Sequence, residues 1–306
     1  MSAGVISNVQ IATPDEAVRP VDLFLDDSGR IGAIVDAGSA PFDDALCLFD
    51  GQGEAIIFPG FIDIHTHGAN GADLSMATAE AVSSMAEAKL SEGVTSFLPT
   101  TWTASPEHTI SMLEAAAGYA RDQKFARTPC VHIEGPFINP AQAGAQDPEQ
   151  IRLPDAAELE RWMEIVPIGI LSLAPERQGA CEMIASCRER GIITSAAHSA
   201  ASHADFLLAK ENGLQHMTHF CNQMSGLHHR EIGLVGSGLC DPDIRLELIC
   251  DGIHLGEDML KLIFSAEASG SADADHRFSG SLAFTRGHLS DWPCENHSER
   301  GGCSTA

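Results

Sequence analysis

Apolar and polar positions follow a regular rhythm from residue 55 onward. Short continuous apolar runs alternate with longer segments rich in Ala, Glu, Leu and Met. A short apolar run bounded by Gly, Pro or polar residues is typical of a strand buried on both faces. The runs predict strands over 55–65, 94–99, 130–134, 167–173, 191–197, 214–219 and 245–251. The segments between them predict helices near 77–91, 106–123, 155–164, 177–190, 201–212 and 257–265.

This alternation of strands and helices predicts an α/β fold with a parallel sheet covered by helices. Seven strands exceed most doubly wound sheets and approach the eight of a (β/α)8 TIM-type barrel. No glycine-rich phosphate loop follows the first strand, which argues against a dinucleotide-binding sheet. We therefore predict an incomplete (β/α) barrel over 55–266.

The two ends of the chain break the rhythm. Residues 1–54 contain shorter strand-like pieces, 21–25 and 31–35, separated by Asp, Gly and Pro, which predict a small β-domain. Residues 267–306 contain no Val, Ile or Met and are rich in Ser, Gly, Asp, Arg and His. This composition predicts a disordered tail and the absence of an eighth barrel strand.

Histidines or carboxylates stand at most of the predicted strand ends. The first strand ends in His65-Thr66-His67, and residues i and i+2 of a strand point to one face. Later strands end with Glu134, Glu176, His198, His219 and His254. In a barrel the carboxyl ends of the strands meet at the face where chemistry takes place. Imidazole nitrogen and carboxylate oxygen are ligands for zinc, iron and manganese, so the pattern predicts a hydrolytic metal site.

Six motifs carry a family resemblance: PGFIDIHTHG, HIEGPFINP, SLAPE, AAHS, THFCNQM and LICDGIH. In order and spacing, up to about residue 264, the chain resembles N-acetylglucosamine-6-phosphate deacetylases of the amidohydrolase superfamily. The resemblance implies metal-dependent hydrolysis of the acetamide of N-acetylglucosamine 6-phosphate. It also implies one or two divalent transition metal ions per subunit, with zinc expected first and iron or manganese as alternatives.

By this resemblance Glu134, His198 and His219 match the principal metal ligands, and His65 and His67 match the pair that holds a second metal in some members. The resemblance assigns substrate binding to Ala145, Asn222, Gln223, Arg230 and His254. The arginine is expected to act across the interface of a homodimer. His132 and His216 precede proposed ligands by two or three residues, and each could be a buried structural histidine or an outer partner of the ligands.

Two departures from the family pattern leave alternatives open. Gln146 follows Gly144-Ala145 where the family has histidine, so a different N-acyl amino sugar is an alternative substrate. No Thr-Asp-Ala segment follows the last helix, so no catalytic aspartate is identified, and a truncated or frameshifted, inactive metal-binding remnant is the other alternative. The absence of lysine from 155–176 favours the sugar-phosphate branch over dihydroorotase-type relatives, which use a modified lysine there.

The net charge limits the classes of partner that we expect, and the cysteines indicate the cellular compartment. A net charge of −25 argues against nucleic acids and anionic membranes, and it requires local cations to hold an anionic substrate. No leader segment and no apolar run long enough to span a bilayer is visible. Nine cysteines without a closely spaced pair are typical of reduced thiols, so we expect a cytoplasmic protein.

Overall fold

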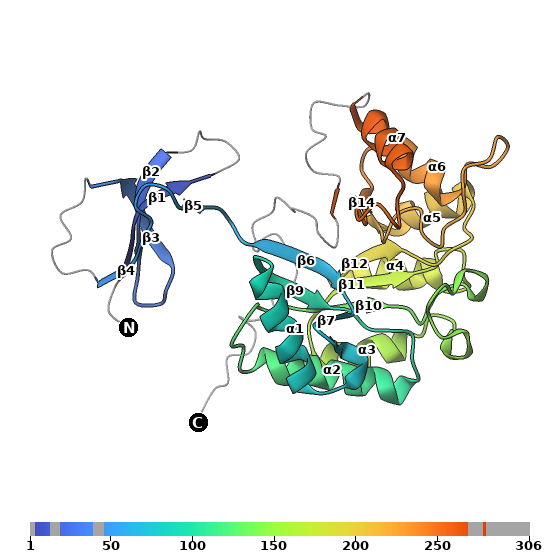
Figure 1. Cartoon of the computed structure of the whole chain (residues 1–306). Coiled ribbons are helices and arrows are strands. Elements are labelled where there is room, and N and C mark those ends of the chain that lie inside the picture. The colour runs from blue at the N-terminus through green and yellow to red at the C-terminus, as the bar shows by residue number, and fades with distance from the viewer. Residues whose placement is uncertain (1–3, 13–18, 39–45, 269–277, 280–306) are drawn as a thin grey trace. The chain divides into compact units, whose positions relative to one another are not determined.

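The computed structural model describes residues 4–12, 19–38, 46–268 and 278–279. The chain divides into two units, Met1–Gly60 and Phe61–Ala306, which are coloured from blue to red along the sequence in Figure 1. In the first unit, β1 (Gly4–Ile11) pairs antiparallel with β2 (Arg19–Leu25), which pairs antiparallel with β3 (Ile31–Asp36). On its other side β1 pairs in parallel with β4 (Leu46–Asp50) and β5 (Ile56–Ile57). Val9, Val21 and Leu23 form the buried core of this unit.

The strand predicted over 55–65 is two separate strands. β5 belongs to the first unit, and β6 (Phe61–Thr66) begins the second. Pro59 and Gly60 lie between them. Proline has no N–H to offer a sheet, and glycine weakens strand pairing, so a continuous apolar pattern is interrupted at this dipeptide.

The second unit contains parallel strands arranged in chain order. After β6 come β9 (Val94–Pro99), β10 (Val131–Glu134), β11 (Ile168–Leu173), β12 (Ile193–Ala196), β13 (His216–Met217) and β14 (Arg245–Glu247). β6 pairs with β9, and β10 through β14 form one continuous parallel sheet. A bridge between Thr100 and His132 links β9 to β10. All seven predicted strands are present, and a short hairpin of β7 (Gly68–Ala69) and β8 (Ala72–Asp73) follows β6.

The sequence predicts no strand beyond the last helix, and this prediction is wrong at two residues. Phe278–Ser279 forms β15, which pairs in parallel with Leu246 and Glu247 of β14. Strand pairing uses backbone N–H and C=O groups, so it does not require the long apolar run that the sequence lacks here. The remainder of the predicted tail, 269–277 and 280–306, lies outside the described residues.

The helices follow the strands as predicted, with one addition. They are α1 (Ala79–Ser91), α2 (Pro106–Ala120), α3 (Ala156–Ile165), α4 (Ala180–Glu189), α5 (His203–Asn212), α6 (Gly233–Cys240) and α7 (Glu257–Ala268), with 3-10 turns at Leu74–Met76, Pro140–Gln142 and Pro148–Gln150. The additional helix, α6, contains three glycines, which have low helix propensity. A Cβ on Gly238 would lie 2.6 Å from the Phe220 ring, so glycine allows α6 to pack closely against the residues after β13.

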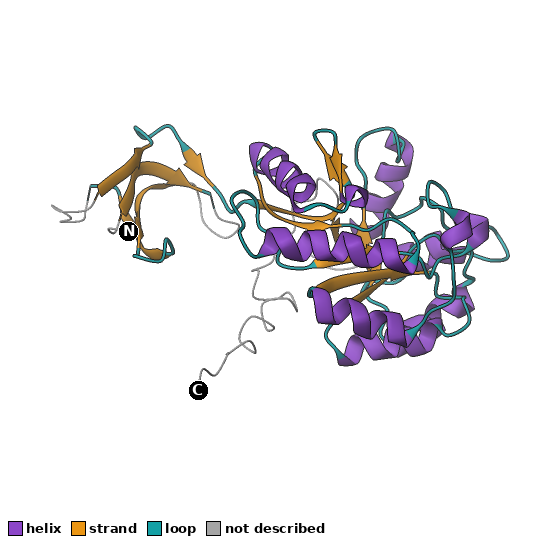
Figure 2. Ribbon diagram, turned by 90° about the horizontal axis from the view of Figure 1, so that it is seen from below, coloured by secondary structure: helices purple, strands orange, loops and turns teal. Residues whose placement is uncertain are grey.

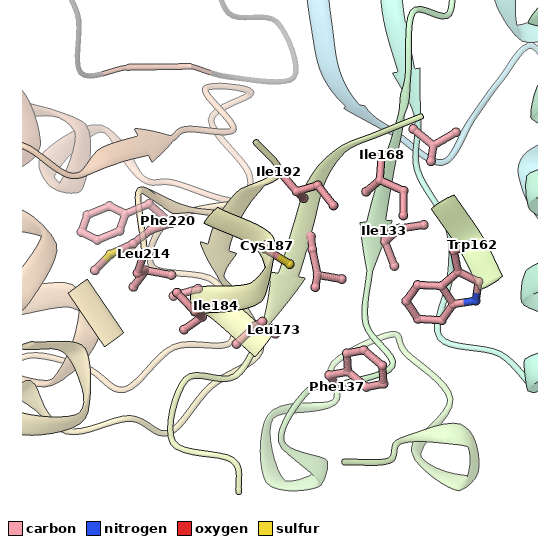
Figure 3. Packing of buried hydrophobic residues seen from close by; sticks show 14 of the residues in the cluster. Ile133, Phe137, Trp162, Ile168, Leu173, Ile184, Cys187, Ile192, Leu214 and Phe220 are labelled. Carbon is pink, nitrogen blue, oxygen red and sulfur yellow. The ribbon is translucent and has the colours of Figure 1, made fainter. Parts of the chain in front are cut away.

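Two apolar cores follow from the alternation of side chains along the strands. The larger core lies between the strands and the helices, which stand outside the strands in Figure 2. Figure 3 shows part of it, with Trp162 of α3 and Cys187 of α4 beside strand residues such as Ile133. The smaller core is formed by Ile62, Ile64, Leu98, Cys130 and Ile170. Ile170 and Leu171 are neighbours in β11 but belong to different cores, because successive side chains of a strand point to opposite faces of the sheet.

Six cysteines of the described chain are free thiols: Cys47, Cys181, Cys187, Cys221, Cys240 and Cys250. Cys130 is disulfide-bonded, so the prediction of reduced thiols is wrong at that residue. Sequence spacing does not reveal which thiols a fold brings together. Among the described residues, no helix is both long enough and apolar enough to cross a membrane.

Candidate metal centre

Four histidines and one glutamate converge at the carboxyl ends of the barrel strands. His65 lies in β6 with His67 just beyond it, Glu134 ends β10, and His198 and His219 follow β12 and β13. The Glu134 carboxylate is almost fully buried, at 1% exposure, and lies among the four rings. The structure thus brings together all five residues that the sequence predicted as metal ligands.

The first ligand set consists of Glu134, His198 and His219. Their facing atoms lie 3.0 Å apart for Glu134 Oε1 and His219 Nε2, 3.3 Å for Glu134 Oε1 and His198 Nε2, and 3.1 Å between the two Nε2 atoms. A tetrahedral ion with bonds of 2.0–2.1 Å holds its ligand atoms about 3.3 Å apart. The three atoms therefore already have the spacing that such an ion requires.

The second set adds His65 and His67 around the same carboxylate. The two Nε2 atoms are 3.3 Å apart, His67 Nε2 lies 2.9 Å from Glu134 Oε2, and His65 Nε2 lies 3.6 Å from Glu134 Oε1. Glu134 thus presents Oε1 to His198 and His219, and Oε2 to His67. A carboxylate that serves two ligand sets from its two oxygens is able to bridge a pair of ions.

The outer hydrogen bonds select ring tautomers that suit metal binding. His198 Nδ1 lies 2.9 Å from the carbonyl of Gln142, and His67 Nδ1 lies 3.2 Å from the carbonyl of Thr100. A carbonyl only accepts, so each Nδ1 carries the proton and each Nε2 keeps a lone pair toward the centre. Such outer partners fix the orientation of ligating histidines in metal proteins.

The electrostatics of the centre favour positive charge. Burial alone would lower the pKa of His65, but the Glu134 and Glu247 carboxylates raise it to about 10. Burial would raise the pKa of Glu134, but His65, His198 and His219 hold it well below its usual range. Buried carboxylates require a compensating cation. A divalent ion held by these residues would supply that charge.

Unusual backbone conformations aim several of these side chains. His198 and His219 have φ of 45° and 36°, in the left-handed region that side chains rarely adopt. Gly135, directly after Glu134, has φ of 70°, and a Cβ there would lie 2.1 Å from Thr103 Oγ1. Left-handed residues cost about 1–3 kcal/mol each and cluster at functional sites. The fold therefore accepts strain at the strand ends to direct these ligands inward.

A pocket of about 360 Å³ opens over the centre. Besides the five ligands, it is lined by Trp102, Gly144, Ala145, Gln146, Asn222, Gln223, Glu247, Ile249 and His254. Four of the five predicted substrate residues therefore border the pocket. Arg230 is the exception, because it is exposed and its guanidinium contacts the His229 ring, 2.9 Å away.

Comparison with known proteins decides the family. The model of the amidohydrolase family matches residues 56–282. The chain belongs to the amidohydrolase family. The amidohydrolase match covers every barrel strand from β6 to β15 together with all five predicted ligands.

Individual relatives share a narrower description. The N-acetylglucosamine-6-phosphate deacetylase of Bacillus subtilis (strain 168) is 34% identical over 276 residues, covering 87% of this chain and 68% of the relative. The N-acetylgalactosamine-6-phosphate deacetylase of Escherichia coli O157:H7 is 36% identical over 204 residues, covering 65% of this chain and 54% of the relative. The crystal structure of N-acetylglucosamine-6-phosphate deacetylase from Thermotoga maritima is 34% identical, with a TM-score of 0.72 over 86% of this chain and 67% of that one.

Three residues of this amidohydrolase pocket were not assigned to the centre from the sequence. Glu247, at the end of β14, contacts His65, and Trp102 stacks on His67 with ring centroids 3.8 Å apart. Gln146 was considered only for its bearing on the choice of sugar, but its amide nitrogen donates to Glu134 Oε2 over 2.7 Å. Trp102 lies three residues beyond Pro99, the end of the second predicted strand, so its position in the sequence could have identified it.

The two histidines left open belong to the interior beneath the centre. His132 Nδ1 donates to the Ile64 carbonyl over 3.0 Å, and its Nε2 accepts from Ser172 Oγ over 2.7 Å. Ser172 in turn bonds Thr218, which bonds Ser195. Both ring nitrogens of His216 are buried without a hydrogen-bond partner among the described residues. Both nitrogens of His132 are occupied by the protein, and His216 is in none of the described groups that could share a metal ion, so we assign neither histidine as a ligand.

Proposed function

We propose that this amidohydrolase removes the acetyl group of N-acetylglucosamine 6-phosphate, giving glucosamine 6-phosphate and acetate, with one or two divalent ions per subunit and zinc as the first expectation. The observation that carries the proposal is the convergence of four imidazoles on Glu134 at the floor of a pocket. Relatives that bear this activity in their names match 87% and 86% of this chain. A pocket of about 360 Å³ is within the usual range for a small-molecule site.

A bound divalent ion would polarise the acetamide carbonyl and lower the pKa of a water molecule toward ~7. The residues of the chain would hold that ion and place the substrate against it. Glu134 would hold the ion or ions from its two carboxylate oxygens, with Gln146 fixing the carboxylate by a hydrogen bond. The surrounding burial would strengthen every electrostatic contact to the carbonyl.

The pocket rim would bind the sugar. Asn222 and Gln223 lie beside His219, and Ala145 lies on the loop after β10. The His254 ring is oriented by Asp251, whose Oδ2 lies 2.7 Å from His254 Nδ1. Because the chain has a net charge of −25, a phosphate group requires local cations. We assign this role to His254 and to Arg230 from a second copy of the chain in a homodimer.

A second candidate is deacetylation of N-acetylgalactosamine 6-phosphate. It is favoured by the identity of 36% with the Escherichia coli O157:H7 relative of that name. The two sugars differ only in the orientation of one hydroxyl group. The choice between them therefore depends on the polar groups of the pocket rim rather than on the metal centre.

The test is an acetate-release assay on metal-loaded protein with four sugars: N-acetylglucosamine and N-acetylgalactosamine, each with and without the 6-phosphate. The proposal expects the highest kcat/KM for N-acetylglucosamine 6-phosphate, and Arg230→Gln should raise KM only for the phosphorylated sugars. Stoichiometric metal with no acetate release from any of them would favour an inactive metal-binding remnant. Protein that folds but binds no divalent metal would refute the proposal.

The turnover rate gives a second test of the proposal, because it depends on the residue that carries the proton. The resemblance places a proton-carrying aspartate at the end of strand 8, whereas the described strand β15 ends with Ser279. General acid–base help is worth ~10²–10⁴-fold in rate. We therefore expect turnover to be slower by about this factor than in a relative that carries the aspartate, measured side by side with the same metal.

A further inference from the structure

Glu247 is a buried carboxylate at the end of β14 whose position has no counterpart in the predicted ligand set. It is 2% exposed, lines the pocket, and places Oε2 3.2 Å from His65 Nδ1. Its other oxygen, Oε1, is buried without a hydrogen-bond partner among the described residues. A carboxylate in this setting is costly unless positive charge is supplied nearby.

The four rings of the centre differ in what holds Nδ1. His67 and His198 donate from Nδ1 to backbone carbonyls, and His219 Nδ1 is buried without a partner in the part of the chain that is described. Of these four rings, only His65 has a charged partner at Nδ1 among the described residues. The difference therefore singles out one ring, and that ring belongs to the set formed by His65, His67 and Glu134.

We propose that Glu247 is a positioning residue that sets the affinity of the His65–His67–Glu134 position for its metal ion. This rests on the proposed function only in requiring that a metal ion occupies that position. Glu247 accepts the hydrogen bond from Nδ1–H of His65, so the Nε2 lone pair faces His67 and Glu134. The negative charge makes the imidazole a more basic ligand, as in other carboxylate–histidine–metal arrangements.

The contact also ties the metal position to the seventh strand. His65 comes from β6 and Glu247 from β14, and the backbone N–H of His219 lies 3.4 Å from Glu247 Oε2. Glu247 thus touches one residue of each ligand set. Because it contacts the ring of His65 but only the backbone of His219, loss of its charge should weaken the His65 position far more than the His198–His219 position.

The test is calorimetric titration of metal-free protein with Zn²⁺, comparing the wild-type chain with Glu247→Gln. Glutamine keeps the size of the side chain but removes its charge. We expect two binding events in the wild type, with the weaker one reduced by ~10–100-fold in the variant, the effect typical of an outer partner. The tighter event should change less than about threefold.

Two further variants make the result specific. Glu158→Gln is the matched control, because Glu158 is also a buried glutamate, at 5% exposure, but pairs with Arg152 outside the pocket. It should leave both binding events unchanged. In a His65→Ala background, which should already lack the weaker event, Glu247→Gln should have no further effect.

Three outcomes would overturn the inference. The first is equal Zn²⁺ affinity in the wild type and Glu247→Gln, the second is an equal loss at both binding events, and the third is a single wild-type event that His65→Ala leaves unchanged. None of these contradicts the proposed function, because one ion at Glu134, His198 and His219 would still suffice. No Zn²⁺ binding in any variant would instead contradict the proposed function itself.

Discussion

His65 and His216 are buried in two regions of the same barrel, and their acid–base behaviour is opposite. Burial alone lowers the pKa of both rings, because it disfavours the charged imidazolium. At the metal centre the Glu134 and Glu247 carboxylates override burial and raise the pKa of His65 to about 10. Around His216, burial and the positive charge of Arg245 act together and lower the pKa to about 3.

The difference shows that carboxylates, rather than histidines, define the metal centre. Histidines occur throughout the interior, and His132 and His216 are both buried more deeply than His65 or His67. In the part of the chain that the structure describes, only the strand ends combine imidazoles with two buried carboxylates. The strand ends therefore favour positive charge, whereas burial and Arg245 disfavour the charged form of His216.

Removal of the shared carboxylate should have the largest effect. We expect Glu134→Gln to weaken metal binding at both positions by more than the ~10–100-fold caused by loss of an outer partner. The pKa of His65 should fall at the same time, because its strongest charged partner is lost. Metal content after dialysis and NMR titration of the ring measure the two effects. Retention of two tightly bound ions would show that Glu134 is not shared.

Displacement of that carboxylate should have the next largest effect. Gly135→Ala places a Cβ 2.1 Å from Thr103 Oγ1 on a backbone with φ of 70°, so we expect the free energy of unfolding to fall by about 3 kcal/mol. Gly179→Ala is the control, because Gly179 has φ of 84° but no described atom closer than 3.9 Å to the added Cβ. Urea denaturation measures both. Equal losses in the two variants would mean that backbone conformation alone, without the steric contact, accounts for the cost.

The pH dependence of the free energy of unfolding tests the surroundings of His216. The folded pKa of His216, about 3, lies below the ordinary value of 6.5, so between these values the unfolded chain binds a proton that the folded chain does not. This contribution to stability is complete above pH 6.5 and is lost as pH falls toward about 3. Between pH 7 and 5 it amounts to roughly 2 kcal/mol.

His216→Leu removes this titration without removing a hydrogen bond. Metal-free protein unfolded in urea with a chelator present should lose roughly 2 kcal/mol more than the variant between pH 7 and 5. Both proteins contain the same carboxylates, so their other titrations cancel in the comparison. Parallel pH profiles would show that the pKa of His216 is the same in the folded and the unfolded protein.

The smallest expected effect on stability comes from the hydrogen bond between Ser172 and His132, which lies between the metal centre and the surroundings of His216. Ser172→Ala leaves His132 Nε2 without its hydrogen bond, and we expect a loss of about 1 kcal/mol in the free energy of unfolding. Ser186→Ala is a partly buried control on α4, outside the barrel interior. Metal stoichiometry should be unchanged in both variants. A lost ion in Ser172→Ala would extend the metal centre one layer deeper than the ligands.

Some features could be derived from the sequence only in approximate form. The seventh strand was predicted over 245–251, which placed its end near His254, but β14 spans Arg245–Glu247. The functional carboxylate at the true end of the strand, Glu247, was therefore overlooked. Similarly, Gln146 was interpreted through the histidine that it replaces, whereas its amide is buried against Glu134. In both cases the relevant partner is more than ten residues away in sequence.

The sequence by itself determined the strand–helix alternation and which histidines and glutamate stand at the strand ends as candidate ligands, because periodicity and strand ends are local properties of the chain. Only the tertiary structure decided which atoms face one another: the two oxygens of Glu134, the hydrogen bond from His65 to Glu247, and the isolation of His216. The physical reason is that charge and hydrogen-bond partners come from strands far apart in sequence. The pKa of a buried histidine depends on those partners, and they meet only when the barrel forms.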